Sequence, residues 1–228
     1  MADELGKFVT HFGVRVDQTR ITARINRETY TQVSTRESFH TYAYAEYMIN
    51  KGEVDNLVLD EVKQQVFYTE SYCMFLRERA LQNYDINMSR FNALDGHEFT
   101  NILNAYIAKH HFTEITDLGF NKFGDPNERG IEGYIYVMVL GQYKQVYIGK
   151  TRSALATRIK QHWHRNKPLD RLVCGPVDTS RISIDCFGAL DTTQIFAKPY
   201  RGKKYFGLEH LEARFIHSFD QRFVLNRL

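Results

Sequence analysis

The chain has 228 residues, of which 43% are hydrophobic, and its formal net charge at pH 7 is +3. This length and composition suit one large or two small globular domains with packed cores. No run of about 18 apolar residues exists to cross a membrane, and the opening residues, MADELGKF, have neither the basic flank nor the apolar core of a signal peptide. We therefore expect a cytoplasmic protein without a membrane partner.

The charge is divided unevenly along the chain. Residues 1–130 carry 14 Lys and Arg against 19 Asp and Glu, a net charge of −5, whereas residues 131–228 carry 16 against 8, a net charge of +8. A basic region attracts polyanions such as nucleic acid. The second half is therefore the part for which a polyanion partner is inferred.

The three cysteines, Cys73, Cys174 and Cys186, stand far apart and form no CxxC pair. An odd, scattered set argues against a disulfide framework and against a structural zinc site. We expect all three to be reduced residues of the core.

Residues 1–120 are predicted to form a mainly α-helical domain, because they contain no proline and little glycine. The first element is a strand pair within VRVDQTRITARI, at residues 14–25, where β-branched residues alternate with polar ones. Three helical runs follow at residues 35–52, 55–82 and 97–111. The run at residues 55–82 could form one helix or two.

The role of residues 1–120 is open between sequence recognition, dimerisation and binding of a protein partner. One basic stretch could read base edges, since Arg suits guanine and Gln suits adenine, or it could form an ordinary polar strand face. Its arginines are Arg15, Arg20, Arg24, Arg27 and Arg36.

Residues 121–130 carry turn residues without periodicity and are predicted to be a linker to a second domain at 131–228. That domain is expected to contain a hairpin, a helix with Ser153 as N-cap, a third strand and a last helix, from the segments GYIYVMVL with KQVYIG, SALATRIKQHWHR, RISIDCFGAL and GLEHLEARFIHSF. The predicted fold class is α+β, with a small, mainly antiparallel three-stranded sheet flanked by helices.

On the last predicted helix, Glu212 falls in the middle of an apolar stripe that includes Leu208 and Phe215. A carboxylate that faces a core costs several kcal/mol of desolvation unless it is paired or binds a metal. Glu212 is therefore expected either to form a salt bridge with a buried arginine or to act as a metal ligand.

On the helix before it, Arg158 and His162 are four residues apart and lie together at the edge of the apolar face. A solvated face explains such a pair, and so does a phosphate site, because Arg offers a fork of donors and His can exchange a proton.

The predicted hairpin carries two phenols, Tyr136 and Tyr147. A phenol has an unperturbed pKa of about 10 and is a poor base unless a neighbouring cation lowers that value. Lys150 and Arg158 are the candidate cations. The alternative is that both rings pack against strands with wet hydroxyls.

Taken together and in order, these elements resemble the GIY-YIG nuclease family over about residues 131–228. Tyr134-Ile135-Tyr136 stands at the first motif of the family and Tyr147-Ile148-Gly149 at the second, with eleven positions from one motif tyrosine to the other. The first motif lacks its glycine, because Tyr134 stands there and Gly133 lies one position earlier. The remaining residues that match are Arg158, His162, Glu212 and, as a supporting residue near the chain end, Asn226.

The resemblance implies hydrolysis of phosphodiester bonds with one Mg²⁺, or Mn²⁺, held by Glu212. It implies that Tyr136 acts as general base on the attacking water, or assists its activation, and that Tyr147 orients this water. Arg158 would stabilise charge on the phosphate, while Lys150 and His162 support proton transfer.

The function implied is a DNA endonuclease, sequence-specific in the manner of a restriction enzyme. Two copies in a homodimer would suit the cutting of both strands. The alternative is a non-catalytic nucleic-acid-binding protein or regulator that retains the fold. The basic residues predicted to contact DNA phosphates, or else to form a solvated surface, are Arg152, His164, Arg165, Lys198, Arg201, Lys203 and Lys204.

Overall fold

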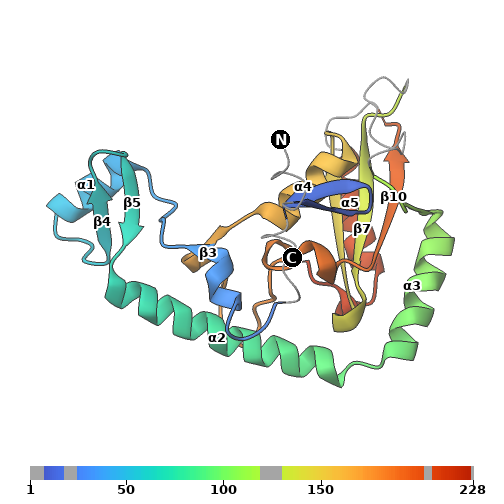
Figure 1. Cartoon of the computed structure of the whole chain (residues 1–228), viewed down its shortest axis with the longest axis horizontal. Coiled ribbons are helices and arrows are strands. Elements are labelled where there is room, and N and C mark those ends of the chain that lie inside the picture. The colour runs from blue at the N-terminus through green and yellow to red at the C-terminus, as the bar shows by residue number, and fades with distance from the viewer. Residues whose placement is uncertain (1–7, 18–24, 119–129, 203–206, 227–228) are drawn as a thin grey trace. The chain divides into compact units, whose positions relative to one another are not determined.

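The chain is a mixed α+β protein in its computed structural model, and its described part falls into two compact units (Figure 1). The described residues are 8–17, 25–118, 130–202 and 207–226. The first unit takes its described residues from 1–25, 89–164 and 183–228, and the second consists of residues 26–88 and 165–182.

This division differs from the predicted boundary, because residues from the predicted N-terminal domain pack with the sheet of the predicted C-terminal domain. The predicted linker lies outside the described residues except for Gly130.

The first unit is built on a four-stranded sheet in the order β6-β10-β7-β8, in which every neighbouring pair is antiparallel. Its strands are β6 (Thr113–Glu114), β7 (Gly133–Leu140), β8 (Gln145–Thr151) and β10 (Gln194–Tyr200). The hairpin β7–β8 confirms the prediction. A separate hairpin joins β1 (Phe8–His11) to β2 (Val14–Asp17).

The strand predicted at residues 181–190 is wrong. The segment instead forms two short 3₁₀ turns, Ile184–Cys186 and Ala189–Asp191. The Ser183 side chain accepts a hydrogen bond from the Asp185 backbone N–H, which turns the chain where apolar alternation suggested a strand. The strand that completes the sheet is β10, which was not predicted from the sequence.

The two faces of β7 are both buried, as expected for a central strand covered on each side. Ile135 and Val137 of β7 lie on one face, together with Ile148 of β8. This face joins a hydrophobic core that includes Leu208 and Phe215 of α5. Residues opposite in the register share a face, so Tyr136, Met138, Gly149 and Tyr147 line the other one.

Three helices of the first unit confirm the predicted runs: α3 (Gly96–His110), α4 (Leu155–His164) and α5 (Gly207–Ser218). Asp95 caps α3 by accepting from the Glu98 N–H. Within this unit α5 lies against β7 and β8 (Figure 1). The chain then ends with a 3₁₀ turn at Gln221–Phe223 and a bridge from Val224 to Val146.

The second unit holds α1 (Tyr42–Asn50) and most of α2 (Glu70–Ala93), which runs on into the first unit. The prediction of helix over residues 55–68 is wrong, since these residues form the antiparallel hairpin of β4 (Leu57–Asp60) and β5 (Gln65–Tyr68). LVLD and QVFY are rich in β-branched and aromatic residues, which favours strands once a turn separates them.

The remaining strands of this unit are the short parallel pair β3 (Ser34–Thr35) and β9 (Lys167–Pro168). None of the helices in the described ranges is both long and apolar enough to cross a membrane.

All three cysteines are free thiols. Cys73 and Cys186 are buried as predicted, whereas Cys174 is exposed, so its placement in the core was wrong.

Candidate functional site

The register of the hairpin β7–β8 brings the two phenols together. Tyr136 pairs with Gly149 and Met138 pairs with Tyr147, and the centroids of the two tyrosine rings are 6.2 Å apart. A Cβ added to Gly149 would lie 2.5 Å from the Tyr136 hydroxyl and 2.8 Å from a ring carbon of Tyr147. The glycine of the second motif therefore leaves the space that both phenols occupy.

Helix α4 closes over this face and adds a histidine. The Tyr136 hydroxyl lies 2.7 Å from His162 Nε2, and the Tyr147 ring meets the His162 ring edge-on with centroids 5.1 Å apart. His162 is on the buried side of α4, one turn after Arg158. The spacing of four residues thus delivers a cation and a proton acceptor to the same two phenols.

His162 has a further partner that sequence reasoning missed. Its Nδ1 lies 2.6 Å from Asp185 Oδ1, and both side chains are almost completely buried. Asp185 belongs to the 3₁₀ turn where a strand was predicted. The signal in the sequence was an acidic residue inside an apolar run, ISIDCF. Because this run was predicted to be a strand, nothing identified His162 as the partner of Asp185.

Burial raises the pKa of both phenols. The pKa of Tyr147 rises to about 12, chiefly through burial, and that of Tyr136 also rises through burial, with the nearby Tyr147 as the next cause. Arg158 lowers both pKa values, as predicted for a cation, but by less than burial raises them. Both phenols are therefore protonated at neutral pH.

The half-buried Arg158 guanidinium lies beside the two phenols. Burial lowers its pKa, but Tyr136, Tyr147 and Asp185 together raise it by more, so the group stays charged. Its Nη1 also donates to Gln161 Oε1 at 3.3 Å. A fixed cation at the mouth of a buried polar cluster suits an anionic ligand.

Glu212 is mostly covered, with its side chain 20% exposed, and it pairs with Lys150 at a distance of 2.9 Å between Oε2 and Nζ. The predicted salt bridge therefore exists, with a lysine as partner in place of a buried arginine. Glu209, one turn earlier on α5, lies 3.7 Å from the same ammonium and 3.5 Å from Arg152. Sequence reasoning missed Glu209.

The sheet separates the two halves of this site. Lys150 pairs with Ile135 and so shares the face that α5 covers, whereas the phenols lie on the face that α4 covers. The Glu212 charge is still close enough to raise the pKa values of both phenols. β8 is the last strand of the sheet, and residues 224–226 bond to its outer edge at Val146 and Ile148.

Glu212 is the carboxylate of this site that could bind a metal, and it suits a metal that takes few protein ligands. The described residues contain no group of three or more His, Cys, Asp or Glu side chains placed to hold a metal ion. Mg²⁺ is commonly bound by one or two carboxylates together with water and substrate phosphate. Glu212 could supply one such carboxylate, and metal binding would then replace its salt bridge with Lys150.

Asn226 holds the edge of β8. Its Oδ1 accepts from the Ile148 N–H at 2.9 Å, and its Nδ2 donates to the Ile148 carbonyl at 2.7 Å. Both polar atoms of this buried amide are thus engaged with backbone. Asn226 fixes the strand that carries Tyr147 and Lys150, and this is a supporting position.

The departure in the first motif leaves the phenol cluster in place. Gly133 occupies the point of close approach, where a Cβ would meet the Thr151 carbonyl at 2.6 Å and a Leu208 methyl at 2.8 Å. Tyr134 is buried in β7 and shares the face of Tyr136. The position at which β8 and α5 approach the backbone so closely that a glycine is needed is therefore Gly133, one residue before the glycine position of the motif.

The described residues among those predicted to contact DNA come from several elements and from both units. Arg152 is exposed and pairs with Glu209, while Lys198 belongs to β10 and donates to the His110 carbonyl at 2.6 Å. His164 ends α4 and Arg201 is exposed beyond β10, whereas Arg165 belongs to the second unit. Lys203 and Lys204 lie outside the described residues.

The arginines of residues 15–36 that the structure describes each contact another side chain. The contacts are Arg15 over the Phe8 ring at 3.8 Å, Arg27 with Asp85 at 3.1 Å, and Arg36 with Glu70 at 3.4 Å. Arg20 and Arg24 lie outside the described residues.

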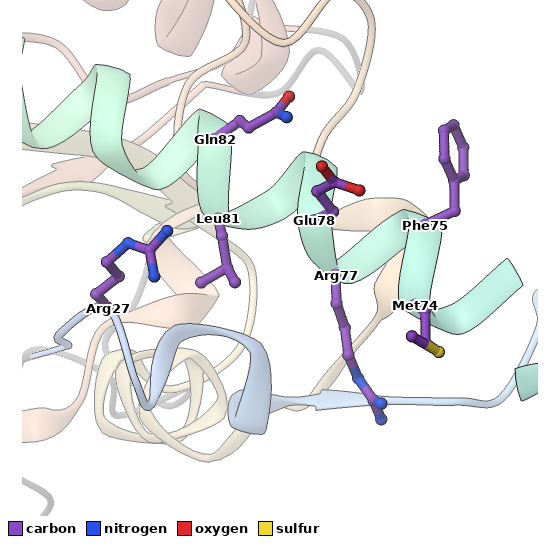
Figure 2. Close-up of a pocket in the computed structure, with 7 residues that line it drawn as sticks. All are labelled: Arg27, Met74, Phe75, Arg77, Glu78, Leu81 and Gln82. Carbon is purple, nitrogen blue, oxygen red and sulfur yellow. The ribbon is translucent and has the colours of Figure 1, made fainter. Parts of the chain in front are cut away.

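A separate pocket of about 660 Å³ lies in the second unit along α2. Figure 2 shows that Arg27 and α2 residues between Met74 and Gln82 line it. Arg27, one of the arginines that could read base edges, lines this pocket, whereas none of the predicted catalytic or metal-binding residues does.

No protein-family model, curated protein or solved structure matches this chain.

Proposed function

We propose that this protein is a Mg²⁺-dependent DNA endonuclease whose active site is formed by β7, β8, α4 and α5 of the first unit. The observation that carries the proposal is the convergence of Tyr136, Tyr147 and Arg158 on the α4 side of β8 with Glu212 close enough to influence both phenols. These four residues match the motifs of the family that the chain resembles, and they come from four different elements.

The chemistry of phosphodiester hydrolysis accounts for this set. Charge builds on the phosphate oxygens as water attacks, and a positioned cation stabilises it. Arg158 is that cation, because its guanidinium remains charged beside the phenols. The metal held by Glu212 would supply Lewis-acid stabilisation of phosphate and leaving oxygens when bound.

The phenols act on the attacking water. Tyr147, protonated at neutral pH with a pKa of about 12, donates a hydrogen bond that orients this water. Tyr136 accepts a proton from the water while its own proton has a receiver at His162 Nε2, 2.7 Å away. Lys150 balances the charge of Glu212 before the metal binds.

The basic balance of residues 131–228 supplies attraction to DNA phosphates. Cleavage is proposed to be sequence-specific, and two copies of the chain would cut the two strands of a symmetric site.

A plasmid-cleavage assay with Mg²⁺ tests the proposal. The decisive variants are Glu212→Gln and Arg158→Ala, each beside a matched control on the same helix. Glu209→Gln removes the other carboxylate that Lys150 contacts, and Lys160→Ala removes an exposed cation two residues after Arg158.

Discrete fragments from the wild type and from both controls, with cleavage lost by at least about 100-fold in the two decisive variants, would support the proposal. Fragments that survive Glu212→Gln would contradict the assignment of the metal ligand. DNA binding without cleavage by the wild type, on several unmethylated DNAs, would favour the non-catalytic alternative.

A further inference from the structure

A buried chain of hydrogen bonds in the first unit links three titratable side chains in series. Tyr136 is 0% exposed, His162 3% and Asp185 7%. The distances are 2.7 Å from the phenol oxygen to Nε2 and 2.6 Å from Nδ1 to the carboxylate. Buried polar groups are expensive unless they bond one another, so this series is a specific arrangement.

The chemistry of each group fixes the direction of the hydrogen bonds. An ionised carboxylate only accepts, so Asp185 requires a proton on Nδ1 of His162. The neutral imidazole then has its lone pair on Nε2, where it accepts from the Tyr136 hydroxyl. The Tyr136 oxygen also accepts a hydrogen bond from Arg158, and its second lone pair can accept a proton from water.

We propose that Asp185 is a positioning residue of this enzyme, which holds His162 in the tautomer that receives the Tyr136 proton. This inference rests on the proposed function. As water attacks phosphorus, one water proton moves to the Tyr136 oxygen and the Tyr136 proton moves to Nε2. The bond to the leaving oxygen breaks, and that oxygen takes a proton from solvent. The imidazolium later returns its proton to solvent, so the cycle is balanced.

This arrangement removes the difficulty of a buried phenol as base. A free phenolate in this site is unfavourable, because burial raises the pKa of Tyr136. When the phenol gains one proton as it loses another, no phenolate accumulates. The charge that develops on His162 lies against the Asp185 carboxylate, which stabilises it.

The position of Asp185 has its own local support. The Ser183 hydroxyl accepts from the Asp185 backbone N–H at 3.4 Å, within the turn of Ile184–Cys186. This turn contacts α4 within the first unit. The turn that replaced the predicted strand is what presents the carboxylate to His162.

The test compares Asp185→Asn with Asp191→Asn. Asp191 is a control from the same segment, since it is also buried and its acceptor bonds go to other partners, namely the Gly188 N–H at 2.7 Å and the Tyr143 hydroxyl at 3.1 Å. An asparagine at 185 can turn its NH₂ toward Nδ1, which moves the ring proton to Nε2 and reverses the bond to Tyr136. Three quantities are measured: single-turnover cleavage rate, DNA affinity and the ¹⁵N shifts of His162, assigned with His162→Gln.

We expect Asp185→Asn to lower the cleavage rate roughly 10²–10⁴-fold with DNA affinity unchanged within about twofold. The ¹⁵N spectrum of the DNA-free wild type should show the Nδ1–H tautomer, and Asp185→Asn should lose it. Asp191→Asn should keep both the rate and the tautomer.

Other outcomes separate this inference from the proposed function. A wild type that cleaves while Asp185→Asn cleaves equally well would overturn the role of Asp185 alone. A wild type with the Nε2–H tautomer would also overturn it. A wild type that does not cleave at all would overturn the proposed function, whatever the spectrum shows.

Discussion

The two units each bury a polar network, and the networks are built differently. In the first unit Tyr136, His162 and Asp185 bond to one another through titratable side chains. In the second unit the amides of Asn83 and Asn87 donate to backbone carbonyls, both of them to that of Ser180, at 2.7 and 2.9 Å. Burial is nearly complete in both.

The difference shows what burial of polar groups means in this protein. An amide that satisfies carbonyls fixes the path of the chain and has no proton to exchange. A phenol, an imidazole and a carboxylate in series can move protons, and a cation and a second carboxylate lie near them. Titratable groups that bond one another therefore distinguish the candidate site from structural burial elsewhere.

The largest expected effect comes from filling the space between the two phenols. Gly149→Ala places a Cβ 2.5 Å from the Tyr136 hydroxyl, which must displace a ring packed in the core. We expect a loss of at least about 100-fold in cleavage and a fall of roughly 1–3 kcal/mol in the free energy of unfolding. Plasmid cleavage and urea unfolding measure the two effects.

Gly96→Ala is the control for that change. A Cβ there meets nothing within 4 Å, at the first residue of α3, so stability should stay equal or rise by up to about 1 kcal/mol. If Gly149→Ala cleaves like the wild type, the placement of the phenols has no part in the reaction.

A smaller effect, confined to stability, is expected in the second unit. Asn87→Ala removes one of the two amide donors to the Ser180 carbonyl and a donor to the Asn83 carbonyl, and each lost hydrogen bond costs roughly 0.5–1.5 kcal/mol. Urea unfolding should show this loss. The folded variant should keep its cleavage rate within about twofold, and a folded variant that has lost cleavage would mean that the two networks are not separate in function.

The smallest effect is an alkaline pH dependence that the two units share. Tyr147 in the first unit and Tyr68 in the second both have a pKa raised to about 12, chiefly by burial. The unfolded phenol loses its proton near pH 10 and the folded one near pH 12. Above pH 10 the unfolded state therefore binds fewer protons, and the free energy of unfolding falls as pH rises.

Each of Tyr147→Phe and Tyr68→Phe should make this fall between pH 10 and 12 less steep, and for Tyr147 the change is at most about 1.4 kcal/mol per pH unit. Urea unfolding at pH 9, 10, 11 and 12 measures it. At pH 7.5 only Tyr147→Phe should lower cleavage, by about 10-fold. Equal cleavage by both variants would show that the Tyr147 hydroxyl has no role in orienting the attacking water.

The sequence predicted the elements whose periodicity is strong. The hairpin β7–β8 and the helices α3, α4 and α5 follow directly from apolar repeats. That Tyr136 and Tyr147 share one face became visible only in the register of the hairpin. The hairpin β4–β5 was taken for helix because its strands are only four residues each, too short for periodicity to separate the two readings.

The rest depended on contacts across the chain. Nothing in the sequence near Asp185 marks it as the partner of His162, which is 23 residues away and lies on a helix. Glu209 and Lys150 were likewise joined only by the packing of α5 on β8. The direction of the phenol pKa values was missed because the sequence shows neighbouring cations but not the burial that outweighs them.

The most direct test of the central claim is the cleavage rate of Tyr136→Phe under single-turnover conditions with Mg²⁺. The substitution removes one oxygen atom and keeps the ring that packs in β7, so the fold should be retained by circular dichroism. We predict that cleavage falls roughly 10²–10⁴-fold while DNA affinity changes by less than about twofold. A variant that cleaves at the wild-type rate would contradict the claim that the buried phenol, backed by His162, takes the proton of the attacking water.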